Sequence, residues 1–378
     1  MSLTERDLIR VARRINNPRR SYLLVNPLQG KHLAVEPQRA LALMRALGAK
    51  IREAAPDIKA VVGFAETATA VGAAAASICA PQGVYVHTTR ERGPEDACWI
   101  DFSEEHSHAQ AQRLQAGMLA EVFACGGTLV LVDDEVTTGK TCLNLVKALR
   151  RELDVVPDRI ILASLISRLG PEDAENMRQA GIECVRLIGP EPADYAALVA
   201  EVAVQPARRP PEQMPSVAVL FAKYELIPDP RMGVRTSDYE RCIGRFCQRA
   251  AGALEAAHRL NAGGRIILLG TEECMYPAIR LGSLLEDRGF SVLTHSTTRS
   301  PIGVAPAADY PVQAGFQLTS CYEQGRETYL YNPAPCDTVV VVTDANGNLQ
   351  AGMEDIVRTY ARSGAHSFAL LKINRKDV

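Results

Sequence analysis

Residues 128–141, with the sequence TLVLVDDEVTTGKT, constrain the fold more than any other part of this chain. Residues 129–132 form an uninterrupted apolar run, which predicts a strand buried on both faces, as in the middle of a parallel sheet. Two acids and a loop rich in hydroxyl groups follow at once. Beyond them, Leu143, Val146 and Leu149 recur at helical spacing. The stretch is therefore predicted to be a strand, a polar loop and a helix.

The predicted loop has the chemistry of a sugar-phosphate site. Backbone N–H groups of residues 138–141 lack helical partners at the start of the helix, and the helix dipole adds positive potential there. Asp133 and Asp134 stand at the carboxyl end of the strand, where open α/β sheets bind ligands, and carboxylates accept hydrogen bonds from vicinal hydroxyls. A loop whose acids only cap the helix is the alternative, but capping does not require an acid pair followed by Thr-Thr-Gly.

The triplet Gly139-Lys140-Thr141 also matches the end of a Walker A motif. That motif requires a glycine five positions before Gly139, and Asp134 stands there. A carboxylate in a triphosphate cradle would repel its ligand. The triplet therefore does not predict a nucleoside triphosphate site.

The acid pair followed by Thr-Thr-Gly resembles the motif with which type I phosphoribosyltransferases, such as the orotate phosphoribosyltransferases, bind 5-phosphoribosyl 1-pyrophosphate (PRPP). The resemblance implies that Asp133 and Asp134 hold the ribose hydroxyls and, directly or through water, Mg²⁺. Members of this family usually carry an aliphatic residue where this chain has Glu135. The resemblance makes the following loop residues PRPP ligands: Glu135, Thr137, Thr138, Gly139, Lys140 and Thr141.

An earlier segment, residues 63–72, repeats the pattern of strand, loop and helix after a predicted strand at 59–62. Its small residues would let a ligand approach the backbone closely, and the resemblance makes it the pyrophosphate loop. Glu66 is unexpected there because two anions repel unless a cation lies between them. It could instead meet Mg²⁺ or a substrate amine, or cap the following helix. The implied ligands are Ala65, Glu66, Thr67, Ala68 and Thr69.

Two loops carry cations that could bind the anionic groups of PRPP. Arg90 ends a predicted strand that begins at Val84, and its guanidinium fork suits phosphate oxygens. A surface arginine at a strand end is equally common. Lys31 and its neighbour His32 could bind an anion or be solvated. We expect Arg90 to balance pyrophosphate charge and Lys31 to contact PRPP.

Residues 93–108 form a long polar excursion that contains Trp99, the only tryptophan. Such an excursion is either a functional lid or disordered. The resembling family carries a flexible catalytic loop here, which implies that His106 and His108 protonate or contact the leaving group. The histidines and their neighbouring acids could also bind a metal, but spacing within a loop supports this weakly.

Composition and charge exclude several classes of protein. The 42 basic and 44 acidic residues nearly balance, so they give no strong sign of nucleic-acid binding. The ten cysteines include no CxxC pair, which predicts reduced, mostly buried thiols rather than a zinc site or a disulfide framework. No run reaches membrane-spanning length and the N-terminus does not read as a signal peptide, so we expect a cytoplasmic protein that contacts no membrane.

A proline-rich segment divides the 378 residues. Residues 206–215 hold four prolines without apolar periodicity, which predicts a semi-rigid linker between domains at 1–205 and 216–378. Strand and helix patterns alternate on both sides, so each domain is predicted to be a doubly wound α/β unit with a mainly parallel sheet. Residues 1–20 are expected to begin with a basic amphipathic helix, and a helix is expected from Pro37 to about Leu47.

The second half repeats the element order of the first. Glu66 and Arg90 are 24 positions apart, and Glu273 and Arg299 are 26 apart. Asp344 follows an apolar strand in the place of the second acid of the motif, but no Thr-Thr-Gly follows it. This register predicts an internal duplication, with a degenerate phosphoribosyltransferase-like second copy. The chemistry is therefore expected in the first half.

Polar residues nevertheless persist at the predicted strand ends of the second half, where such folds carry their sites. They could form a second ligand site, contribute to the first site across the domain interface, or serve as hydrogen-bond partners in an ordinary packed interface. These residues are Glu272, Glu273, Thr297, Thr298, Arg299 and Ser300.

The sequence Thr-Arg-Ser-Pro at 298–301 resembles the signature of the TRSP domain, which follows phosphoribosyltransferase domains in bacteria. Such fusions resemble members of gene clusters linked to tellurite resistance and stress, which implies synthesis of a nucleoside-like metabolite. The whole resemblance implies a Mg-dependent pentosyltransferase that joins an unknown nitrogenous acceptor to PRPP and releases pyrophosphate. It also allows a homodimer. A PRPP or nucleotide sensor without turnover, and glycosidic-bond cleavage in the reverse direction, are the alternatives.

Overall fold

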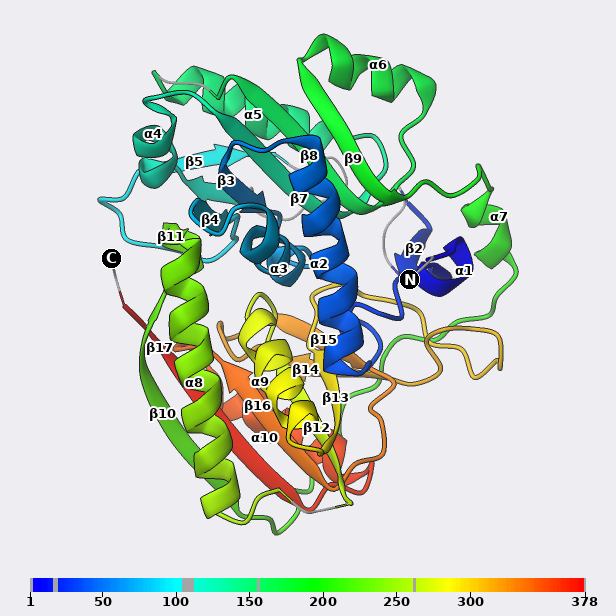
Figure 1. Ribbon diagram of the computed structural model, residues 1–378. Coiled ribbons are helices and arrows are strands. Elements are labelled where there is room, and N and C mark those ends of the chain that lie inside the picture. Colours follow the sequence, from blue (N-terminus) through cyan, green and yellow to red (C-terminus); the bar gives the residue numbers. More distant parts are fainter. Residues whose placement is uncertain (1–2, 16–19, 104–111, 155–156, 261–262, 377–378) are drawn as a thin grey trace.

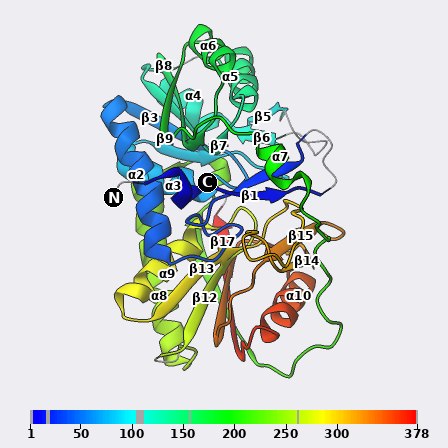
Figure 2. The ribbon, with the colours of Figure 1, turned by 90° about the vertical axis from the view of Figure 1, so that its right-hand side faces the viewer.

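Two mainly parallel sheets, one from each half of the chain, organise the protein (Figure 1). The computed structural model describes residues 3–15, 20–103, 112–154, 157–260 and 263–376. Helices pack on both faces of each sheet, so the predicted doubly wound α/β class is confirmed. Figure 2 shows α8 and α9 on one side of the second sheet and α10 on the other.

The first sheet has the strand order β11-β4-β3-β7-β8-β9. Its strands are parallel except β11, which runs antiparallel to β4. Apolar residues of β7 are fully buried because helices cover both faces of this central strand. The strands are β3 (Ile58–Gly63), β4 (Val84–His87), β7 (Thr128–Val136), β8 (Arg159–Ser167), β9 (Ile182–Ile188) and β11 (Val234–Arg235). The helices are α2 (Pro37–Ala54), α3 (Thr69–Cys79), α4 (Gly117–Phe123), α5 (Lys140–Glu152), α6 (Pro171–Gln179) and α7 (Tyr195–Ala200).

The second sheet is wholly parallel, with the order β10-β17-β16-β12-β13. Alternation along β12 places Ile266 and Leu268 in the core under α9, and Ile267 and Leu269 in the core under α10. The strands are β10 (Val219–Pro228), β12 (Arg265–Gly270), β13 (Ser291–Ser296), β16 (Thr338–Thr343) and β17 (Ser367–Lys376). The helices are η1 (Pro230–Met232), α8 (Thr236–Ala256), α9 (Tyr276–Asp287) and α10 (Leu349–Ala361).

Three antiparallel hairpins stand beside the sheets. The strand β5 lies within the excursion predicted at 93–108 and pairs with β6, so residues 99–102 of that excursion form a strand. The hairpins are β1 (Arg10–Arg13) with β2 (Tyr22–Val25), β5 (Trp99–Phe102) with β6 (Gln112–Gln115), and β14 (Gly315–Thr319) with β15 (Glu327–Tyr331).

The helix predicted for residues 1–20 is wrong over the described part of that segment. The helix α1 spans only Glu5–Leu8, and β1 follows it. Pairing with β2 decides this, because every residue of β1 has a backbone partner there. The helix predicted from Pro37 is confirmed but continues to Ala54, because Ile51 extends its buried stripe.

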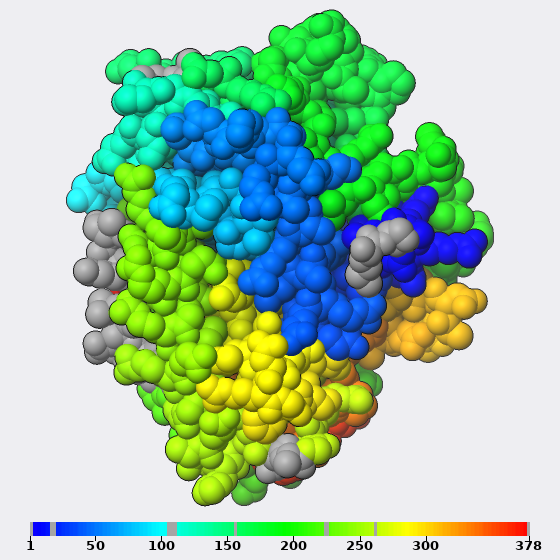
Figure 3. All heavy atoms as spheres, viewed as in Figure 1, coloured from blue at the N-terminus to red at the C-terminus, as the bar shows by residue number. Residues whose placement is uncertain are grey.

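The two halves share one hydrophobic core. The same cluster of buried side chains includes α2 and α3 of the first half and α8 and α9 of the second. The strand β11 lies beyond the predicted linker yet extends the first sheet. Figure 3 shows α2 meeting α9 directly on one face of the molecule. The halves therefore form one packed body in which residues from both sides can build a common site.

The order of elements in the second half agrees with the predicted repeat. Four strands of the first sheet, β4-β3-β7-β8, have the same neighbours as β13-β12-β16-β17 in the second. In each half a helix joins the first two of these strands along the chain, and a hairpin follows before the third. The duplication itself stays a prediction.

Each of the ten cysteines lies in the described residues and is a free thiol, and six of them are buried. Over the described ranges, no helix has both the length and the apolar character that crossing a membrane would require.

Candidate functional site

The acid pair lies near the carboxyl end of β7, and the glycine-containing loop joins β7 to α5, as the sequence predicted. The strand β7 continues to Val136, and α5 begins at Lys140. Gly139 has a φ of 69°, a left-handed conformation that glycine adopts without steric cost. The first N–H groups of α5 therefore face the loop, as an anion-binding helix start requires.

A cavity of about 200 Å³ lies over this loop. It brings together both acids, the loop and part of the 65–69 segment, all of which the sequence singled out. The predicted residues that line it are Asp133, Asp134, Glu135, Thr137, Thr138, Gly139, Lys140, Thr141, Ala65, Thr67 and, from the second half, Ser300.

Sequence reasoning did not select most of the remaining lining. Arg14 and Arg20 lie between β1 and β2 of the hairpin, and Leu23 and Leu24 belong to β2. No local pattern marks these residues as ligands, because only the packing of the hairpin over the sheet brings them to the cavity. The other unselected lining residues are Phe64, Gln112, Val136, Cys142 and Leu162, and His32, which the sequence marked as a possible anion ligand, also lines the cavity.

The carboxyl group of Asp134 has a raised pKa. Burial raises its pKa to about 6, and repulsion from Glu135 acts in the same direction. The backbone N–H of Asp134 donates to Oδ1 of Asp133 at 2.9 Å. A cation beside the pair would offset this cost, because it attracts both carboxylates.

Glu135, the departure from the family pattern, has its charge balanced within the protein. Nη2 of Arg20 lies 2.6 Å from one oxygen of Glu135, and Nη2 of Arg168 lies 2.8 Å from the same oxygen. Arg20 precedes β2 and Arg168 follows β8. The glutamate therefore ties the β1–β2 hairpin to the sheet at the rim of the cavity.

Lys31 and Glu66 face the second half of the chain. The buried Lys31 ammonium forms an ion pair with Glu66 and donates to the carbonyl oxygens of Glu272 at 2.9 Å and Thr297 at 3.0 Å. The backbone N–H of Arg299 donates to the Glu66 carboxylate at 3.2 Å. Neither Lys31 nor Glu66 lines the cavity.

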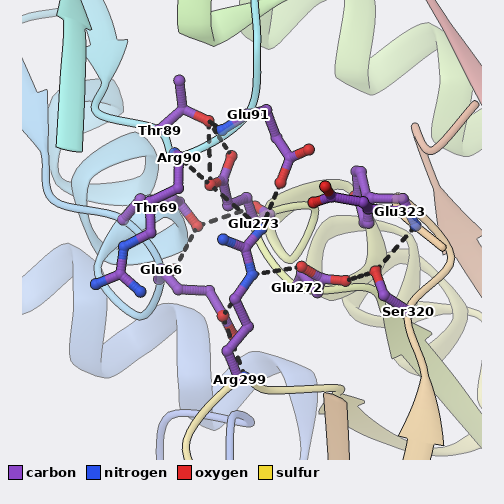
Figure 4. Close-up of polar contacts among 12 residues, drawn as sticks. Glu66, Thr69, Thr89, Arg90, Glu91, Glu272, Glu273, Arg299, Ser320 and Glu323 are labelled. Atoms are coloured by element: carbon purple, nitrogen blue, oxygen red, sulfur yellow. Dashed lines mark hydrogen bonds and ion pairs between the residues drawn. The ribbon is translucent and has the colours of Figure 1, made fainter. Parts of the chain in front are cut away.

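Glu273 joins the 65–69 segment and the end of β4 to the second half. Its carboxylate accepts from Oγ1 of Thr89 at 2.9 Å and from the backbone N–H of Arg90 at 3.4 Å. Its carbonyl oxygen accepts from Oγ1 of Thr69 at 3.0 Å. Figure 4 shows these contacts beside the ion pair of Arg299 with Glu272.

Four of the six candidates from the second half contact the first half, namely Glu272, Glu273, Thr297 and Arg299. Thr297 Oγ1 accepts from the backbone N–H of Glu272, and Thr298 pairs through its backbone with Tyr329. Ser300 is the one of the six that lines the cavity. The interface interpretation thus describes the contacts of Glu272, Glu273, Thr297 and Arg299. Thr298 bonds within the second half, and Ser300 reaches the first site.

Side chains of the second half fill the place that corresponds to its own acid pair. Asp344 accepts from Nη1 of Arg231 at 2.7 Å, Nε of Arg375 at 3.0 Å and the Tyr322 hydroxyl at 2.5 Å. Burial opposes ionisation of Asp344, but the two arginines outweigh it and lower its pKa. This aspartate is therefore an ion-pair partner in the core.

His106 and His108 lie outside the described residues. Within the described ranges, no group of three or more His, Cys, Asp and Glu side chains could hold a metal. Asp133 and Asp134 still fit Mg²⁺, because this ion commonly takes one or two carboxylates and completes its shell with substrate phosphates and water.

The ionisation of Glu273 predicts a pH-dependent stability. Burial opposes ionisation, but Arg231 and Arg299 outweigh it and lower the pKa of Glu273 to about 2. Because this folded-state pKa lies below the unfolded value, the stabilisation is complete above about pH 4.5 and is lost as the pH falls towards 2. We expect the difference in free energy of unfolding between wild type and Glu273→Gln to shrink by about 2 kcal/mol from pH 6 to pH 3.

Urea unfolding of both proteins at the two pH values measures this difference. Glu172→Gln, at an exposed position of α6, serves as the control and should show no such pH dependence. A difference between wild type and Glu273→Gln that stays constant with pH would contradict the ion-pair assignment.

The fold and the cavity define an α/β protein that presents an acid pair and a glycine-containing loop at the carboxyl ends of a parallel sheet. Residues 8–189 match the family model described as phosphoribosyl transferase, and residues 229–359 match the one described as the TRSP domain C-terminal to it. The chain thus belongs to the phosphoribosyl transferase family in its first half and carries a TRSP domain in its second. Both resemblances expected from the sequence are confirmed.

Solved structures give weaker likenesses. An adenine phosphoribosyltransferase from Giardia lamblia, complexed with 9-deazaadenine, is 19% identical over 49% of this chain and 95% of its own, with a TM-score of 0.36. The Rhodothermus marinus adenine phosphoribosyltransferase is 16% identical over 49% and 96%, with a TM-score of 0.36. A hypothetical protein from Neisseria gonorrhoeae with bound ppGpp is 18% identical over 43% and 85%, with a TM-score of 0.28. These likenesses carry no argument about substrate, and no curated protein matches the chain.

Proposed function

We propose that this protein transfers ribose 5-phosphate from PRPP to a nitrogenous acceptor and releases pyrophosphate. The observation that carries the proposal is the single cavity over β7, which joins the acid pair, the loop at 137–141 and part of the 65–69 segment. The acid pair would accept hydrogen bonds from ribose hydroxyls, and the backbone N–H groups of the loop would donate to a phosphate. The small residues of the 65–69 segment would let pyrophosphate approach the backbone closely.

Different residues that line the cavity would bind different parts of PRPP. Thr137, Thr138 and Thr141 and the start of α5 would bind the 5-phosphate, while Asp133 and Asp134 would accept from the ribose hydroxyls. Ala65 and Thr67 would contact pyrophosphate through their backbone. Most of the rate enhancement would then come from positioning and from exclusion of water.

Mg²⁺ is part of the proposal. Asp133 and Asp134 would hold it, and its charge would neutralise the pyrophosphate leaving group. The side chains of Lys31, Glu66 and Thr69 contact other protein groups, so any role for them in catalysis would be positioning the 65–69 segment. Roles of Arg90, His106 and His108 at the leaving group stay predictions.

A sensor that binds PRPP or a nucleotide without turnover is the alternative from another class, and reverse cleavage of a glycosidic bond is the alternative reaction. A link to tellurite resistance and stress, through a nucleoside-like metabolite, stays an expectation from the resemblance. So does a homodimer, which sedimentation would test.

Phosphorus NMR tests the function directly. The protein is incubated with Mg²⁺, PRPP and a panel of free bases or a cell extract, and we expect pyrophosphate to appear with at least one acceptor. A parallel sample without Mg²⁺ should release little. Tight PRPP binding without release for any acceptor would contradict the transferase and favour the sensor.

A further inference from the structure

One wall of the cavity is built jointly by the β1–β2 hairpin and the second half. Arg14, just after β1, forms a backbone bridge with Ile302. The backbone N–H of Ile15 donates to the carbonyl of Pro301 at 3.2 Å, and that of Gly303 donates to the carbonyl of Arg13 at 2.8 Å. These bonds hold the 298–303 segment against the hairpin.

Tyr331 fixes the same segment from the other side. Its hydroxyl donates to the carbonyl of Ser300 at 2.7 Å and accepts from the backbone N–H of Ile302 at 2.7 Å. Ser300 is consequently held at the cavity, where it and Arg14 both belong to the lining. The second half thus contributes part of the wall of the site in the first half.

His32 lies in the same wall and has an unused hydrogen-bonding atom. Its side chain is 4% exposed and lines the cavity, and its Nε2 has no hydrogen-bond partner in the described part of the chain. Buried polar atoms normally have partners, so a buried nitrogen left without one at a cavity points to a ligand. Burial, together with Lys31, His295 and Arg14, lowers the pKa of His32 to about 3. The imidazole is therefore neutral at physiological pH.

The remaining character of this wall limits what it can bind. Leu23, Leu24 and Phe64 give the cavity apolar surface suited to the face of a flat ring. The Arg14 guanidinium is close enough to depress the pKa of His32, and it would repel a cationic ligand. The phosphate end of the cavity comes from other elements, the loop at 137–141 and the start of α5.

We infer that His32, Ser300 and Arg14 form the acceptor subsite, and that it takes an uncharged or anionic planar nitrogen heterocycle and rejects cationic amines. This inference rests on the proposed function, because it assigns the rest of the cavity to PRPP. Nε2 of His32 and the hydroxyl of Ser300 would hydrogen-bond to the ring edge, while the apolar residues contact its face. The TRSP domain thereby contributes to acceptor specificity through Ser300.

Nitrogen NMR of ¹⁵N-histidine-labelled full-length protein tests the subsite. The probes are adenine, hypoxanthine, uracil and ethanolamine, each added with and without PRPP. The Nε2 signal of His32 is assigned by its absence in His32→Gln. We expect at least one of the three heterocycles to shift this signal and ethanolamine to leave it unchanged. A signal that no heterocycle shifts, or that ethanolamine shifts, would overturn the inference.

Binding measurements on variants separate this inference from the proposed function. His32→Ala and Ser300→Ala should each weaken binding of the responsive heterocycle about tenfold and change PRPP affinity less than about twofold. His366→Ala, at an exposed histidine, is the matched control and should change neither. Loss of PRPP affinity in His32→Ala would place His32 in the PRPP site and overturn the subsite while leaving the transferase intact. Absence of PRPP binding by the wild type would instead reject the proposed function and, with it, the acceptor assignment.

Discussion

Replacing Asp133 and Asp134 together by asparagine is expected to weaken PRPP binding at least 100-fold, which corresponds to about 2.7 kcal/mol. Both carboxylates line the cavity, and the change removes the anionic acceptors for the ribose hydroxyls and for Mg²⁺. Folding should survive, because the pKa of Asp134 is already raised by burial and a neutral amide removes that cost. Calorimetric titration with PRPP and Mg²⁺ measures the affinity.

A matched double variant controls for the loss of charge. Glu172→Gln with Asp173→Asn removes two adjacent acids from the first turn of α6, outside the cavity, and should leave PRPP affinity unchanged. Equal melting temperatures of the two double variants would show that folding is not the cause of any difference. An unchanged affinity in Asp133→Asn with Asp134→Asn would refute the PRPP assignment.

Replacing Arg231 by methionine is expected to lower the free energy of unfolding by about 3–5 kcal/mol. The Arg231 side chain is buried and contacts three carboxylates, at 2.7 Å for Glu273, 2.7 Å for Asp344 and 3.2 Å for Asp229. Methionine has a similar volume but no charge, so the three buried carboxylates would lose the guanidinium that they share. Thermal melting should show a decrease of roughly 5 °C or more.

Replacing Arg231 by methionine should also affect ligand binding in the first half of the chain. Glu273 joins Arg231 to Thr89 and, through its backbone, to Thr69 at the end of the 65–69 segment. We therefore expect a weaker PRPP affinity as well as a lower melting temperature. Arg241→Met is the control, because its ion pair with Asp238 is exposed and worth less than about 1 kcal/mol. Equal melting temperatures for the two variants would contradict the role of the buried network.

The sequence predicted the structure correctly where residues adjacent along the chain determine it. The apolar run, the acid pair and the glycine of residues 128–141 predicted a buried strand, a loop and a helix, and β7, Gly139 and α5 occur there. It failed for residues 1–20, because β1 is stabilised by pairing with β2 rather than by its own periodicity. Contacts between distant segments cannot be deduced from a local pattern.

Lys31 and Glu66 illustrate the same limit at the site. The sequence marked both as polar residues in loops near a strand end, which is all that a local pattern conveys. Their side chains pair with each other and with groups of the second half more than 200 positions away. Burial of these charges against specific partners depends on how the two halves pack.

The sequence alone determined the family, the α/β class and the location of the loop at 137–141, because each depends on residues adjacent along the chain. The tertiary structure decided which residues share the cavity and which hold the two halves together. It brought Ser300 to the loop of the first half and directed Glu273 into a buried ion-pair network. The physical reason is that charge pairing and cavity lining depend on distances across packed elements, which periodicity and spacing do not encode.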